Sequence, residues 1–173
     1  MTNPVTEASD SGHRRGTVWA WGLAAAWALF VWGLGGDDLS LEGTSRFLGP
    51  LIRWLLPDVT TETSELIQFM IRKAAHVTEY GVLSFLILRA MVFAPGGATT
   101  RRIAAAAGLA IAFAAADETR QSLSALRLGS IYDVGLDSLG ALAGVGFLLL
   151  LRRMLPGLGR QFSLLGPENS VSK

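Results

Sequence analysis

The chain has no cysteine, so disulfide bonds and thiolate metal sites are excluded. It also lacks an excess of one charge, and its net charge of +1 gives no electrostatic case for nucleic-acid binding. A glycine-rich phosphate-binding loop is missing, and so is an internal repeat with a period of about 20–50 residues. The function must therefore be sought outside disulfide scaffolds, P-loop proteins, repeat proteins and nucleic-acid binders.

Apolar residues, by contrast, make up 50% of the 173 positions, a length that suggests one domain. They are gathered in long blocks, and a helix needs about 20 mainly apolar residues to cross a membrane. The predicted fold is therefore all-α, an integral membrane four-helix bundle. The membrane domain is expected at 17–152, with spans at about residues 17–35, 74–94, 103–122 and 132–151.

The segments outside these spans are polar or only briefly apolar. Residues 1–16 are predicted to be a disordered tail and residues 153–173 a second tail. In the first loop, the apolar stretch 47–56 predicts a short helix in the membrane interface, interrupted near Pro50. A signal peptide is the alternative for the first apolar block, but the Gly-Gly-Asp-Asp that follows it does not read as a cleavage site.

The basic residues predict how the spans are oriented. Arginine pairs at 14–15, 101–102 and 152–153 fall on one side of the membrane if there are four spans, whereas the first loop is acidic. Cytoplasmic loops of membrane proteins are enriched in lysine and arginine. Both termini are therefore predicted to be cytoplasmic, with the first and third loops outside.

Three polar stretches stand at the outer ends of the last three predicted spans. Ionisable side chains at the edge of a span are costly to bury and by default suggest a functional site. Two of the stretches share their helix face with small residues deeper in the span, and such stripes let membrane helices approach closely. We therefore expect the stretches to converge, bringing together Lys73, His76, Glu79, Tyr80, Asp117, Glu118, Gln121, Arg127, Asp133 and Asp137.

This set of side chains can combine acid–base chemistry with anion binding. The candidate acid–base residues are His76, Glu79, Asp117 and Asp133. An imidazole beside a carboxylate can move protons, and we expect His76 to do so with Glu79 or Asp117. The candidate ligand-binding residues are Lys73, Tyr80, Glu118, Gln121, Arg127 and Asp137. Among them, Lys73 and Arg127 would hold a phosphate or carboxylate, and the two aspartates of the last span would orient the basic groups.

Other interpretations of the same residues stay open. They can be solvated boundary residues, or a structural salt-bridge network, since buried charges must be paired. A metal site built from His76, Glu79, Asp117 and Asp133 has suitable ligand types, but it has a single candidate histidine and no ligand-spacing motif. No metal or cofactor is predicted. Transport is disfavoured because the ionisable groups lie at one edge and no proline interrupts the last three spans.

The order and spacing of these residues resemble a known family. The motifs are R-K-x-x-H-x-x-E-Y at 72–80, D-E-x-x-Q at 117–121 and R-x-G-S-x-x-D-x-x-x-D-x-x-G at 127–140. Together they resemble the VanZ-like family of small bacterial membrane proteins, over about residues 60 to 150.

The resemblance implies a multi-pass protein of the bacterial cytoplasmic membrane in a cell-envelope setting. The family takes its name from a member associated with resistance to the glycopeptide teicoplanin, so a link to antibiotic resistance is an expectation. We expect the site to face outward and to bind, or in the stronger form to modify, an anionic membrane lipid, lipid-linked precursor or cell-wall component. The alternative is a non-enzymatic envelope partner or assembly protein in which the charged cluster is a salt-bridge clamp.

Overall fold

The computed structural model describes residues 4–34, 41–93, 97–123 and 130–155, and every regular element in these ranges is an α-helix. The all-α prediction is confirmed. The helices are α1 (Pro4–Leu34), α2 (Leu41–Leu55), α3 (Thr61–Phe93), α4 (Thr100–Ser122) and α5 (Ile131–Met154).

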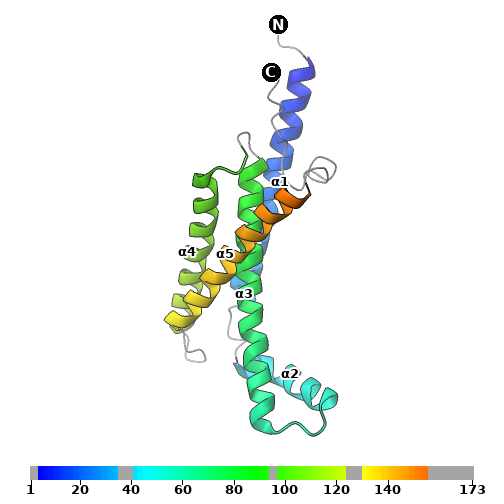
Figure 1. Ribbon diagram of the computed structural model, residues 1–173, viewed down its shortest axis with the longest axis vertical. Helices are drawn as coiled ribbons and strands as arrows, with labels where there is room; N and C mark the ends of the chain where they lie inside the picture. Colours follow the sequence, from blue (N-terminus) through cyan, green and yellow to red (C-terminus); the bar gives the residue numbers. More distant parts are fainter. Residues whose placement is uncertain (1–3, 35–40, 94–96, 124–129, 156–173) are drawn as a thin grey trace.

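The helix α3 is the central element of the molecule (Figure 1). It packs against every other helix, and α5 crosses over it while α4 and α5 also contact each other. The long helices α1, α3, α4 and α5 form the bundle. The short helix α2 lies beyond that bundle and runs across the first turns of α3 (Figure 1).

Three of the described helices are long and apolar enough to cross a membrane, namely α1 from Arg14 onward, α3 and α5. The exposed surfaces of these helices carry large apolar side chains such as Trp19, Leu29 and Phe147, as contact with lipid requires. The helix α4 is rich in alanine and is not in this group. Its 23 residues measure about 34 Å, enough for a hydrocarbon core of about 30 Å, so the fourth span stays a prediction.

The helix boundaries lie close to those that the apolar blocks predict, with two differences. The helix α1 begins at Pro4, where a disordered tail was expected up to residue 16, because the span propagates toward its amino end once formed. Pro50 lies inside α2 and does not interrupt it. The tail predicted at 153–173 lies mostly outside the described residues.

Glycines set the distance between α3 and α5. A Cβ atom added at Gly144 would collide with the carbonyl oxygen of Gly81 and the hydroxyl of Ser84, and one added at Gly140 would collide with the backbone of Val77. The Ser84 hydroxyl also donates a 2.6 Å hydrogen bond to the Ala141 carbonyl. The predicted stripe of small residues on α5 is therefore the surface on which the two helices touch.

The end of the bundle where α4 begins and α5 ends is basic. Arg102 of α4 donates to the carbonyl of Gly97 at 2.8 Å, and a Cβ at Gly97 would lie 3.9 Å from the guanidinium of Arg152 in α5. Gly97 has a φ of +62°, a backbone conformation that favours glycine and that lets the chain turn into α4. The polar motifs are therefore at the other end of the bundle from these arginines.

Candidate functional site

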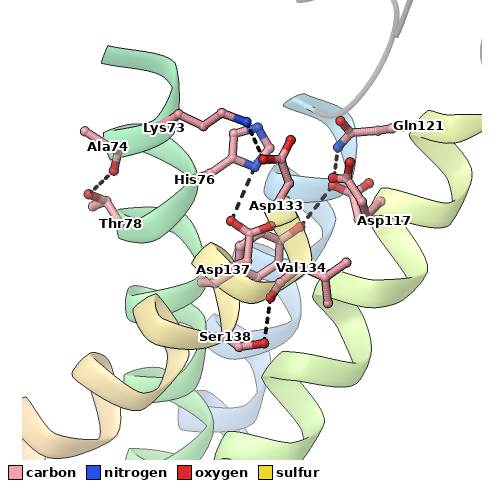
Figure 2. Close-up of polar contacts among 12 residues, drawn as sticks. Lys73, Ala74, His76, Thr78, Asp117, Gln121, Asp133, Val134, Asp137 and Ser138 are labelled. Atoms are coloured by element: carbon pink, nitrogen blue, oxygen red, sulfur yellow. Dashed lines mark hydrogen bonds and ion pairs between the residues drawn. The ribbon is translucent and has the colours of Figure 1, made fainter. Parts of the chain in front are cut away.

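Two side-chain pairs, each a basic residue beside an aspartate, connect α3 to α5 at the polar end of the bundle (Figure 2). The Lys73 ammonium donates to the carboxylate of Asp133. One turn deeper, His76 Nδ1 lies 3.7 Å from Asp137 Oδ1, which is within ion-pair range but too long for a hydrogen bond. We call these four side chains the α3–α5 ladder.

Local sequence spacing explains why the ladder forms. Lys73 and His76 are three residues apart on α3, and Asp133 and Asp137 are four apart on α5, so each pair of residues lies on one helix face. The Ser130 hydroxyl accepts a hydrogen bond from the Tyr132 amide and caps α5. Asp133 then falls in the first turn, where the positive end of the helix dipole favours a carboxylate.

Asp137 is the most unusual member of the ladder. Only 1% of its surface is exposed, yet neither carboxylate oxygen makes a hydrogen bond among the described residues, and neither does His76 Nδ1. Burying a carboxylate without hydrogen-bond partners is costly, so proteins that keep such a group generally use it. The other three side chains of the ladder are partly accessible, since about a quarter of Lys73, His76 and Asp133 is exposed.

Asp117 of α4 lies beside the ladder and is buried to the same degree, but its oxygens are fully used. One oxygen accepts from the Tyr80 hydroxyl at 3.0 Å and from the Gln121 amide at 2.8 Å. The other accepts from Arg120 Nε at 3.2 Å and from a terminal nitrogen of Arg120 at 2.6 Å. This Asp117 network ties α4 to α3.

Arg120 also connects α1 to the site through two contacts with Trp32. Its guanidinium donates to the backbone carbonyl of Trp32 at 2.8 Å and stacks on the Trp32 ring, 4.4 Å from its centre. Arg120 was absent from the candidate site residues. Its position three residues after Asp117 is the signal that could have identified it, because residues at that spacing are neighbours on a helix.

The remaining candidate residues take other positions. The Glu118 carboxylate, 6% exposed, accepts a 2.5 Å hydrogen bond from the Ser130 amide and so joins α4 to the start of α5. The backbone carbonyl of Glu79 accepts from the Trp27 indole of α1 at 3.0 Å. Arg127 lies outside the described residues.

The structure gives His76 a different carboxylate neighbour from the expected one. His76 was expected to work with Glu79 or Asp117, but the carboxylate that it approaches is Asp137. Its ring lies beside that of Tyr80, with centres 6.4 Å apart. Within the described part of the chain, no three histidine, aspartate or glutamate side chains are grouped closely enough to hold a metal ion.

The fold and the site define a multi-pass helical membrane protein with a cluster of charged side chains enclosed at one end of its bundle. The model of the VanZ/LLP1 family matches residues 37–152, a range that holds the ladder and the Asp117 network, and the chain belongs to this family. No curated protein and no solved structure matches the chain.

Proposed function

We propose that this protein binds an anionic lipid-linked or cell-wall component at the α3–α5 ladder, and that His76 and Asp137 exchange a proton with it. The observation that carries the proposal is the Asp137 carboxylate beside His76, which accepts no hydrogen bond from the part of the chain that the structure describes. A pair that served only to hold two helices together would be expected to have its hydrogen bonds complete.

The chemistry of the ladder suits such a ligand. Lys73 has three N–H donors, and its hydrogen bond to Asp133 uses one of them, so the ammonium can also approach a phosphate or carboxylate. His76 and Asp137 below it form an imidazole–carboxylate pair, a combination that proton-transfer sites use. The predicted contribution of Arg127 to anion binding is part of the same proposal.

The outward orientation of the site is also part of the proposal. It is supported by the separation of charge along the bundle, because arginines 102 and 152 meet at the end opposite the ladder. Lysine and arginine are enriched on the cytoplasmic side of membrane proteins. With the arginine end inside, both termini are cytoplasmic and the ladder faces the cell envelope.

Native mass spectrometry of gently extracted protein tests the binding step. We expect the wild type to retain a specific anionic lipid or envelope precursor, and His76→Ala and Asp137→Asn to lose it while remaining folded. Glu62→Gln is the matched control, because Glu62 is an exposed acid on the first turn of the same helix. Retention of the same adduct by all four proteins would contradict the proposal.

A structural clamp is the second candidate, and the Asp117 network favours it, since that carboxylate is buried and saturated. In this case His76→Ala and Asp137→Asn would reduce the stability of the protein, and no specific adduct would be found on the wild type. The chain would then act as a non-enzymatic envelope partner or assembly protein.

A role in glycopeptide resistance forms part of the proposal as well. Expression of the wild type in a teicoplanin-susceptible host is expected to raise the inhibitory concentration of the drug, and expression of the Asp137→Asn variant is not. Equal susceptibility with and without the wild-type protein would count against this role and would leave the binding test unaffected.

A further inference from the structure

The helix α2 has three distinct faces. The first packs on α3, where Ile52 is 5% exposed and a Cβ at Gly49 would lie 3.9 Å from the Gln68 amide. The second exposes Phe47, Leu51 and Trp54, with 76%, 49% and 76% of their surfaces free. At 100° per residue these three residues lie within an arc of about 60°, so they form one continuous apolar stripe.

The third face of α2 is basic. Arg46 and Arg53 are both exposed and are seven positions apart, which places them about 20° apart around the helix. No acidic residue occurs between positions 45 and 56; the acidic residues nearest this stretch are Glu42, in the first turn of α2, and Asp58 and Glu62, which follow in the connection and in α3. An exposed apolar stripe beside a basic stripe is the pattern of helices that lie in the surface of anionic membranes.

The position of α2 agrees with such a surface. The helix α2 runs across α3 and not along it (Figure 1). If α3 spans the membrane, α2 therefore lies along the membrane surface. Its contact at Gln68 is eight residues beyond His76, or about 12 Å along the helix axis.

At the level of this contact, α3 itself exposes Leu66, Phe69 and Met70. Both helices therefore present large apolar side chains at the same height. Exposed apolar side chains on two helices at one height are what the boundary of a bilayer would cover.

We propose that α2 is a binding surface for anionic lipid. Its apolar stripe enters the boundary between headgroups and acyl chains, and Arg46 and Arg53 contact lipid phosphates. The surface of the bilayer then lies at the level of Gln68, and the ladder lies one to three helical turns below it. This inference concerns a surface separate from the ladder and does not depend on the proposed function.

The absence of cysteine allows a direct test, because each introduced thiol is unique. A nitroxide is attached to Leu51→Cys of the full chain in nanodiscs of phosphatidylglycerol and phosphatidylcholine. Its collision rates with oxygen, which concentrates in lipid, and with a water-soluble nickel chelate are then measured. We expect oxygen to be favoured several-fold at this position. The matched control is Thr63→Cys on the exposed first turn of α3, where the chelate is expected to be favoured.

The role of the arginines is tested in the same assay. The Arg46→Gln/Arg53→Gln pair of changes, or nanodiscs of phosphatidylcholine alone, should shift the Leu51→Cys label toward the chelate. Equal depth under all three conditions would overturn the preference for anionic lipid. A label favoured by the chelate in anionic nanodiscs would overturn the proposal altogether, as would spin–spin broadening from a second copy of the chain on this face.

Discussion

The two buried aspartates of the site, Asp117 and Asp137, have the same burial and opposite surroundings. Each is 1% exposed, but Asp117 accepts four hydrogen bonds while Asp137 accepts none among the described residues. Burial alone therefore does not show what a charged residue does in a membrane protein. The completeness of its hydrogen bonding separates a carboxylate that holds helices together from one that is available for chemistry.

The sequence neighbours of the two aspartates explain the difference. Three and four residues after Asp117 come Arg120 and Gln121, which supply donors on the same helix face. Three and four residues after Asp137 come Gly140 and Ala141, which have no side-chain donor. Both lie where α5 contacts α3, and at Gly140 there is no room for a larger side chain. Asp137 therefore depends on donors from other helices, and among the described residues His76 Nδ1 lies 3.7 Å from it.

The largest effect is expected at Asp117. The Asp117→Ala variant leaves the Tyr80 hydroxyl and the Arg120 guanidinium without their shared acceptor, which should lower the free energy of unfolding by about 3–5 kcal/mol. Thermal or denaturant unfolding in detergent micelles measures it. If Asp137→Ala cost as much, the proposed distinction between the two aspartates would be wrong.

A smaller loss is expected at the helix crossing. The Gly144→Ala change places a methyl group against Gly81 and Ser84 and should cost about 1–3 kcal/mol of stability, because the helices must separate to accept it. The matched control is Gly146→Ala on the same helix, where a Cβ would meet nothing within 4 Å. Equal unfolding temperatures of the two variants would argue against a tight crossing.

Conservative replacement of Arg120 sharpens the comparison further. Lysine cannot bond both Asp117 and the Trp32 carbonyl in the forked geometry of a guanidinium, so Arg120→Lys should lose about 1 kcal/mol. Arg101→Lys at the other end of α4 is exposed and serves as the control. A loss confined to Arg120 in the unfolding assay supports its role; equal stability of the two variants contradicts it.

The smallest effect on stability is expected at Asp137. The Asp137→Asn variant removes a buried charge that accepts no hydrogen bond from the described residues, so the free energy of unfolding should change by less than about 1 kcal/mol or rise slightly. Ligand retention in native mass spectrometry should nevertheless be lost. A variant that unfolds easily would show that the ion pair with His76 is structural.

Much of this arrangement could be predicted from the sequence, because apolar blocks determine the long helices and polar motifs mark their ends. A close helix contact was also expected from the stripe of small residues on the last span, and Gly140 and Gly144 make that contact with α3. The partner of His76 could not be predicted, since it depends on the angle at which α5 crosses α3. The attachment of α1 was also missed, because it uses backbone carbonyls of Glu79 and Trp32, which have no residue-specific signal.

The contact of α3 and α5 at their glycines has a mechanical consequence for the ladder. With the backbones touching at Gly140 and Gly144, the two helices cannot move closer, so the spacing at the ladder depends on the angle at which α5 crosses α3. Asp133 lies seven residues away, or about 10 Å along α5, so a rotation of about 6° would shift it by about 1 Å. The distance between Asp133 and Lys73 is therefore sensitive to the crossing angle of α5.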